Sequence, residues 1–264
     1  MRAIVRQHYG GPGQLAIQEL PEPEPTRGHI CIEVKGFGLN HAETYMRKGE
    51  WGEVAKVSGI ECVGLVQEDL DGRFVAGQKV AALMGGRGRT INGSYAEFTR
   101  VPSTNVVPIE SELPWEELAA IPESYSTAWA CLYANLALAA EQTLLIRGVT
   151  SALGQAALNI ARYAGVHVLA TTRNPGRVPM LEELGAKSVL LEGPGALASS
   201  PRTLSKGNRR GPGTGRQQHH RGFVGDGAAW RTSLPGRLSG RSGSDRFLQP
   251  LAPDAEWSAF QLLW

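Results

Sequence analysis

The chain has 264 residues, of which 42% are hydrophobic and 20% are charged, as in a globular protein of one large or two smaller domains. A formal net charge of +2 excludes both a strongly basic nucleic-acid-binding protein and an acidic disordered chain. The charge is unevenly placed, because nine Arg and one Lys stand against four acidic residues from Arg202 onward. The chain is therefore an acidic body with a basic tail.

The cysteines and the lengths of the apolar runs indicate where in the cell the protein is expected. Cys31, Cys62 and Cys131 are far apart and form no paired motif, so neither a disulfide framework nor a thiolate metal site is expected. No stretch has the pattern of a secretory leader or the length of a membrane span. We expect a cytoplasmic protein that has no membrane partner.

Residues 1–112 read as short strands separated by turns. The turn at 9–13 is built from Gly and Pro, which supply or restrict unusual backbone angles. Regularly spaced short strands predict a β-barrel-like or sandwich domain. The predicted strands cover residues 3–5, 15–17, 29–37, 62–67, 79–83 and 95–101.

Residues 113–194 have a different periodicity. Helices are expected at 115–120, 126–140, 155–164 and 175–184, the last ended by Gly185. Short apolar strands are expected at 143–147, 166–170 and 188–191. The β-α-β-α-β order predicts an α/β fold with a parallel, doubly wound sheet and right-handed crossovers.

The turn between the first of these strands and the following helix is the candidate phosphate site. Free backbone N–H groups at such a junction attract a pyrophosphate, and small residues let it approach closely. The G-x-G-x-x-G pattern is not met, because Val149 and Ser151 occupy its first two glycine positions, so a ligand-free tight turn remains the alternative. The candidate residues are Gly148, Thr150, Ser151, Ala152, Leu153 and Gly154.

The end of the second strand of this unit indicates which dinucleotide is bound. NAD sites place an acidic residue there for the ribose 2′-hydroxyl, whereas this chain has Thr172 and Arg173, with Arg177 nearby. Hydroxyl and guanidinium groups suit a 2′-phosphate, so we predict NADP(H). The alternative is that both arginines are ordinary surface residues.

Residues 195–264 have yet another composition. They contain no Ile, only one Val, and many Gly, Arg, Pro and Ser residues. Such a segment cannot bury enough apolar surface to offset the entropy of ordering, so disorder is expected.

Five stretches together resemble a known family. They are Gly38–Gly49, Gly59–Gly64, Gly93–Glu97, Ala119–Pro122 and the turn at 148–154. Their order is similar to that of the medium-chain dehydrogenase/reductase superfamily, in its zinc-independent, quinone oxidoreductase-like branch. The resemblance implies a GroES-like β-barrel catalytic domain over 1–112 and an incomplete Rossmann domain over 113–194. It also implies a small-molecule substrate (a quinone or enone), and a homodimer for the complete family member, which is in doubt for this chain.

The resemblance also addresses zinc. The zinc-dependent branch has a Cys where this chain has Asn40 and a His where it has Ile60. Asn and Ile do not make a tetrahedral zinc site, and the four-cysteine lobe of that branch is absent. We therefore expect hydride transfer without a metal, which suits a quinone because its ring stabilises the incoming charge.

Residue roles follow only from the resemblance. Asn40 matches the polar residue beside nicotinamide and substrate, Tyr45 and Trp51 match the aromatic lining, and Thr127 matches the threonine near the nicotinamide amide. The alternatives are a turn residue for Asn40 and core packing for the two aromatics. His41 departs from the family's usual residue, and no role is inferred for it.

The tail departs from the family pattern. When the possible coding DNA of the tail is read one nucleotide downstream, the segments that begin at Lys206, Gln217 and Pro253 can encode amino-acid sequences that resemble the family. This predicts that the reading frame changes somewhere between about Gly193 and Thr203. Sequencing the coding DNA tests this. We expect impaired activity, and the alternatives are a non-catalytic NADPH-binding or partner-binding remnant or an Arg/Gly arm that binds RNA. Nucleic-acid binding is not the expected outcome.

Overall fold

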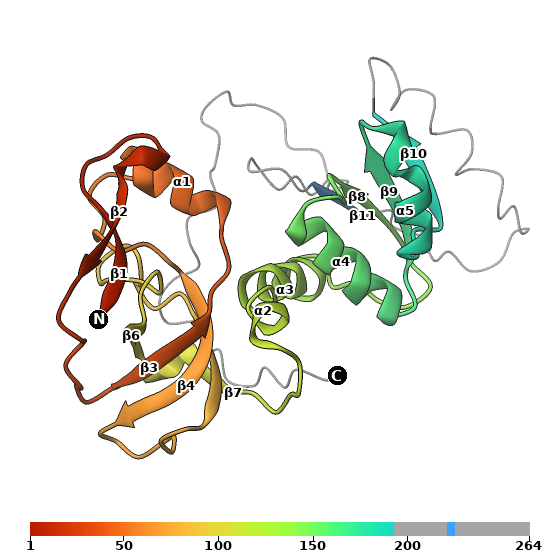
Figure 1. Ribbon diagram of the computed structural model, residues 1–264. Coiled ribbons are helices and arrows are strands. Elements are labelled where there is room, and N and C mark those ends of the chain that lie inside the picture. Colours follow the sequence, from red (N-terminus) through yellow and green to blue (C-terminus); the bar gives the residue numbers. More distant parts are fainter. Residues whose placement is uncertain (193–220, 225–264) are drawn as a thin grey trace, which may run out of the picture. The chain divides into compact units, whose positions relative to one another are not determined.

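The computed structural model describes residues 1–192 and the backbone of residues 221–224 (Figure 1). The described chain divides into two compact units, one from Met1 to Glu123 and one beginning at Ser124. None of its helices is both long and apolar enough to cross a membrane. Each unit has its own core and is described by itself.

The first unit is built on antiparallel strands. Its five-stranded sheet has the order β6-β3-β4-β5-β7, and strands β1 and β2 form a separate hairpin in which Ile4 pairs with Ile17. Side chains that alternate inward from the larger sheet, such as Ile30, Ile32 and Val80, form the core because one face of each strand is buried. The strands are β1 (Arg2–Arg6), β2 (Leu15–Glu19), β3 (His29–Gly36), β4 (Glu61–Asp69), β5 (Lys79–Leu83), β6 (Phe98–Pro102) and β7 (Val106–Pro108).

Two helices join this unit, and one of them was not predicted. Helix α1 (His41–Lys48) follows β3, with Asn40 as its N-cap and Gly49 at its end with a φ of 84°. It buries Met46 in a small cluster with Val54 and Ile60. Helix α2 (Trp115–Leu118) lies where a helix was predicted.

The second unit contains a parallel sheet of order β10-β9-β8-β11. Apolar residues of the sheet, such as Leu144, Ile146 and Val168, pack against Leu158 and Leu181 of two helices. The predicted β-α-β-α-β order is confirmed. The elements are α3 (Pro122–Trp129), which starts at the end of the first unit, the π-helical turn η3 (Ala130–Asn135), β8 (Thr143–Arg147), α4 (Ala152–Tyr163), β9 (His167–Thr172), η4 (Pro175–Arg177), α5 (Val178–Glu183) and β10 (Ser188–Leu191).

Several predicted elements differ from the structure, and three of them illustrate why. The helix predicted at 126–140 starts at Pro122 and ends at Asn135, because Ala137 takes a left-handed φ of 46° that a helix cannot contain. The predicted helix 175–184 divides into η4 and α5. The strand predicted at 95–101 begins only at Phe98.

The sheet does not stop at the three strands expected from the sequence. Strand β11 (Arg221–Val224) pairs with β8 in parallel, on the edge opposite β9. The expected disorder of 195–264 is therefore wrong for these four residues, since the unpaired backbone groups of β8 offer a template for another strand. The other residues of the predicted tail, and the proposed change of frame with them, lie outside the described residues.

Candidate functional site

The turn between β8 and α4, the candidate phosphate site, is held in shape by its own residues. Gly148 adopts a φ of 64°, which lets the chain reverse directly after the strand. Ser151 is the N-cap of α4: its Oγ accepts a hydrogen bond from the Gly154 N–H at 3.1 Å and donates one to the Gly148 carbonyl at 2.9 Å. These bonds hold the turn in one conformation.

Gly154 brings helix α4 close against the turn. A Cβ atom at this position would lie 2.6 Å from the Gly148 carbonyl oxygen and 2.6 Å from Val149 Cα, so only glycine fits. The N–H groups of Ala152 and Leu153 stand in the first helical turn, where no helical carbonyl can accept from them. The turn has no acidic residue, and its donors and helix dipole fit a pyrophosphate.

The end of β9 presents the residues predicted to select NADP(H). The hydroxyl of buried Thr172 accepts from the Asn174 N–H at 3.2 Å, so it shapes the turn. Asn174 Oδ1 in turn accepts from the Gly176 N–H at 2.9 Å. Arg173 and Arg177 are both exposed at the surface. The turn therefore leaves the two guanidinium groups accessible to an anion.

A carboxylate that the sequence did not flag also lies at this edge of the sheet. Glu192 follows β10 and accepts hydrogen bonds from the hydroxyl of Thr171 and from Arg147, the latter at 3.3 and 3.4 Å. These bonds lower the pKa of Glu192, with a further contribution from the charge of Arg173. The sequence could have pointed to Glu192, because it directly follows a predicted strand and ligand-binding groups gather at the carboxyl ends of parallel strands.

Thr127 lies in helix α3, half-buried in the second unit. Helix α3 is tied to α4 by a bond from Asn159 Nδ2 to the Tyr125 hydroxyl, at 2.9 Å. The residues predicted to contact the cofactor thus belong to one unit: Thr127, the turn at 148–154, Thr172, Arg173 and Arg177.

Asn40 lies in the first unit, held at both its backbone and its side chain. Its backbone N–H donates to Glu43 Oε2 at 2.8 Å, and its side-chain Nδ2 donates to Glu61 Oε1 at 2.7 Å. Glu61 Oε2 accepts from the Glu123 N–H at 2.7 Å. Because Nδ2 faces Glu61, the amide orientation of Asn40 is set by a residue 21 positions away.

Two buried carboxyl groups surround this asparagine. Glu43 also accepts from the Ile60 N–H at 3.0 Å and from the Tyr95 hydroxyl. Burial is the main cause that raises the pKa of both Glu43 and Glu61, and it also raises the pKa of Tyr95. The charge of buried Arg87 acts in the opposite direction on both carboxyl groups. Hydrogen bonds to these two carboxyl groups therefore hold both the backbone and the side chain of Asn40.

Arg87 is fixed next to the position that the resemblance compares with a zinc ligand. Its Nη2 donates to the Ile60 carbonyl at 3.0 Å and its Nη1 to Cys62 Sγ at 2.9 Å. Ile60 itself is an apolar core residue, 3% exposed. Across the described ranges, no group of three or more His, Cys, Asp or Glu side chains could hold a metal ion.

The predicted aromatic residues lie on or after α1. The Tyr45 hydroxyl is 3.2 Å from His41 Nε2, and the two rings meet edge to face at 5.0 Å. Trp51 is 47% exposed and has the guanidinium of Arg89 5.6 Å from its ring, so it is not a core residue. The sequence analysis assigned no role to His41. Its contact with Tyr45 could have been predicted, because residues four positions apart on a helix are neighbours.

Comparison with known proteins finds one matching family model and a set of relatives that match most of the chain. The Alcohol dehydrogenase GroES-like domain model matches residues 26–111. A quinone oxidoreductase from Lama guanicoe is 30% identical over 179 residues, which is 65% of this chain and 52% of the relative. This chain thus spans about half the length of that relative.

Solved structures resemble the chain over a similar range. The crystal structure of an NAD-dependent alcohol dehydrogenase has a TM-score of 0.71 and 29% identity, covering 78% of this chain and 68% of the other. A mycobacterial protein solved with NADPH has a TM-score of 0.65 and 26% identity, covering 73% and 58%. These two proteins differ in the nicotinamide cofactor named, so the choice for this chain depends on its own residues.

Proposed function

We propose that this chain, which is similar to the medium-chain dehydrogenase/reductase superfamily and has quinone oxidoreductase-like relatives, is an NADPH-dependent oxidoreductase that works without zinc. The proposed acceptor is a quinone or an activated alkene or ketone. The nicotinamide cofactor, when bound, supplies the hydride. The residues of the chain bind and orient the reactants and stabilise the developing charge.

The observation that carries the proposal is the turn between β8 and α4. Two hydrogen bonds of Ser151 fix its conformation, and Gly154 lets the helix approach closely, while the N–H groups of Ala152 and Leu153 lie in the first turn of the helix. Two donors and a helix dipole at one point favour a phosphate over a neutral ligand. We infer that the cofactor pyrophosphate binds here.

The preference for NADPH over NADH is supported by the charges at the end of β9. Arg173 and Arg177 are exposed cations, whereas the nearby carboxylate of Glu192 is already paired with Arg147. A 2′-phosphate would gain charge-assisted hydrogen bonds from the exposed guanidinium groups. A ribose 2′-hydroxyl would need an available carboxylate, and Glu192 is engaged elsewhere.

On the acceptor side, we propose that Asn40 and the pair Tyr45–His41 act on the substrate oxygen. The Asn40 side chain is held by Glu61, so its amide is oriented before substrate binds. Reduction of a carbonyl oxygen also needs a proton; solvent is one source, and we propose that the Tyr45 hydroxyl, 3.2 Å from His41 Nε2, is the donor. Neither group requires a metal.

The cofactor preference is tested by charge reversal. The double variant Arg173→Glu/Arg177→Glu should bind NADPH at least about tenfold more weakly, while its affinity for NADH falls less. Lys187→Glu, at an exposed cation elsewhere in the same unit, is the matched control. Titration of tryptophan fluorescence measures both cofactors. Equal losses for NADPH and NADH, or no loss, would refute the assignment of the 2′-phosphate to these arginines.

A second candidate is cofactor binding with little or no turnover. It is favoured by the composition of residues 195–264, which contain no Ile and only one Val. The two candidates separate in one experiment: NADPH quenches tryptophan fluorescence under both, but a quinone accelerates NADPH oxidation only if the chain is an active enzyme. Binding without acceleration would select the second candidate.

A further inference from the structure

One buried carboxyl group of the first unit accepts hydrogen bonds at both of its oxygens. Glu61, at the start of β4, is 3% exposed. Its Oε1 accepts from Asn40 Nδ2 at 2.7 Å, and its Oε2 accepts from the Glu123 backbone N–H at 2.7 Å. Gly38 leaves room for the group, because a Cβ there would overlap Oε1 and lie 2.7 Å from the carboxyl carbon. Both oxygens of Glu61 therefore face donors.

The two donors differ in whether an acceptor can take their place. A backbone N–H only donates, so Oε2 opposite Glu123 has to remain an acceptor. A side-chain amide carries both kinds of group, and a half turn about its last bond exchanges the NH₂ and the oxygen. A proton bound by Glu61 therefore belongs on Oε1, and Asn40 satisfies it by turning Oδ1 toward it.

Three other titratable or charged groups act on Glu61. The charge of Glu43, on α1, disfavours ionisation of Glu61, whereas the charge of Arg87, between β5 and β6, favours it. Tyr95, in the segment before β6, donates its hydroxyl to Glu43. Burial has the largest effect and raises the pKa of Glu61, so this group binds a proton at a less acidic pH than an exposed glutamate does.

We propose that Glu61 is a positioning residue whose charge decides which end of the Asn40 amide faces the acceptor. The inference rests on the proposed function, in which Asn40 acts on the substrate oxygen. When Glu61 takes a proton from solvent, the amide turns over, Oδ1 and Nδ2 exchange places, and the N–H that stabilises the developing charge leaves its position. The ionised form is the active one, so kcat falls toward acidic pH.

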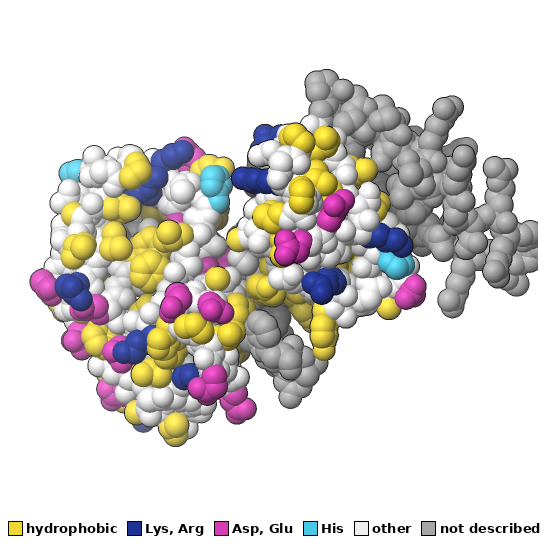
Figure 2. All heavy atoms as spheres, turned by 45° about the vertical axis from the view of Figure 1, so that its right-hand side comes forward, with side chains coloured by type: hydrophobic (Ala, Val, Ile, Leu, Met, Phe, Trp, Pro, Cys, Tyr) yellow, Lys and Arg dark blue, Asp and Glu magenta, His cyan; other side chains and the backbone are white. Residues whose placement is uncertain are grey.

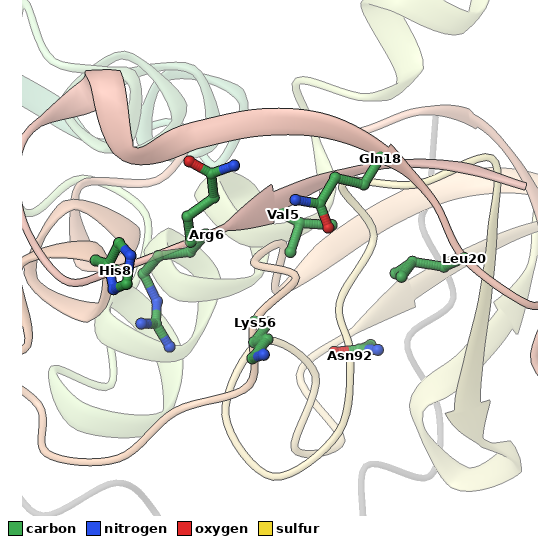
Figure 3. Close-up of a pocket in the computed structure, with 8 residues that line it drawn as sticks. Val5, Arg6, His8, Gln18, Leu20, Lys56 and Asn92 are labelled. Carbon is green, nitrogen blue, oxygen red and sulfur yellow. The ribbon is translucent and has the colours of Figure 1, made fainter.

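The cavities near β1 play no part in this arrangement. The cavity shown in Figure 3, of about 500 Å³, is lined by residues such as Val5, Gln18 and Lys56. A second cavity of about 730 Å³ also has Lys56 in its lining. Neither is lined by Asn40 or Glu61, so the inference concerns only the contact between these two side chains.

The test compares the wild type with E61Q in the full chain. The side chain introduced in E61Q keeps an oxygen for the Glu123 N–H and places its NH₂ against Asn40, so it imitates the protonated carboxyl group at every pH. NADPH oxidation with p-benzoquinone is measured from acidic to mildly alkaline pH, and the protein-free rate is subtracted. E68Q, the same substitution at an exposed position of the same strand, is the matched control.

At neutral pH, kcat of E61Q should be lower than that of the wild type by about tenfold or more. The ratio of the two kcat values should approach one toward acidic pH, while the KM for NADPH stays unchanged and E68Q follows the wild type. Glu43 is present in both proteins, so its own titration affects both kcat values. A merely structural role for Glu61 would lower kcat by the same factor at every pH, and such a constant ratio would overturn the inference.

No turnover at any pH would contradict the proposed function, and a second measurement then decides the inference. In NMR spectra of the isotope-labelled full chain, the side-chain amide signals of Asn40, identified by their loss in N40S, should shift with pH in the wild type and shift less in E61Q. Equal shifts in both proteins would overturn the inference. If E61Q does not fold, E43Q takes its place: it should retain the shift, and loss of the shift there would overturn the inference.

Discussion

The strictest steric requirement at the proposed cofactor site is at Gly154, and Gly154→Ala tests it. An added Cβ would lie 2.6 Å from both the Gly148 oxygen and Val149 Cα, whereas ordinary contact begins at 3.4 Å. Both neighbours are backbone atoms, so helix α4 must move away by roughly 0.8 Å, a forced displacement that costs about 1–3 kcal/mol. The better helix propensity of Ala returns at most about 1 kcal/mol. We expect a net loss of about 1–2 kcal/mol.

The same displacement moves the N–H groups of Ala152 and Leu153, so NADPH affinity should fall by about tenfold or more. Urea unfolding measures the first effect, and fluorescence titration with NADPH measures the second. Gly13→Ala is the matched control, because a Cβ there meets nothing within 4 Å, and its stability should change by less than about 0.5 kcal/mol. If Gly154→Ala unfolds at the wild-type urea concentration and binds NADPH as tightly, the argument from close packing is refuted.

Three further substitutions test other parts of the account. Ser151→Ala removes the N-cap of α4 and should cost about 0.5–2 kcal/mol in urea unfolding, together with weaker NADPH binding; an unchanged midpoint would contradict the capping role. Tyr45→Phe should lower kcat for a quinone by about tenfold or more without changing NADPH affinity, whereas Tyr163→Phe, at an exposed tyrosine, should change neither. Burial raises the pKa of Glu61 above its ordinary 4.5, so the wild type loses unfolding free energy as pH rises from 4.5 through the raised pKa. Glu61→Gln should make that loss smaller, with the remainder due to Glu43, whose pKa is also raised; parallel pH curves would refute the contribution of Glu61.

The sequence predicts best those elements that are short apolar runs bounded by turns. The strands at 79–83, 143–147 and 188–191 have the predicted bounds, because each is a continuous apolar segment whose neighbours cannot extend it. Helix α1 was missed because Met46 is its only fully buried apolar side chain, so no apolar stripe marks it. Its N-terminal signal was present, with Asn40 as N-cap and Glu43 at the third helical position.

Several site contacts could not be read from the sequence, because their partners are far apart in it. Tyr95 donates to Glu43 across 52 positions, and Arg147 pairs with Glu192 across 45. Only the folded strands bring these groups together, and each single residue resembles an ordinary surface charge in isolation. The local turn at 148–154, in contrast, was predictable because strand, turn and helix follow directly along the chain.

The charged side chains on one face of the molecule are of both signs. On the face shown in Figure 2, acidic and basic groups are interspersed over the described part of the molecule, with no broad patch of one sign.

The central claim is that the chain transfers hydride from NADPH to a quinone, and the most direct test is the rate of NADPH oxidation with p-benzoquinone. The account predicts saturable, protein-dependent oxidation of NADPH that exceeds the rate without protein, is slower with NADH, and at limiting NADPH is slower in Gly154→Ala. Oxidation at the protein-free rate despite saturable NADPH binding would contradict the catalytic claim. A higher rate with NADH than with NADPH would contradict the cofactor assignment.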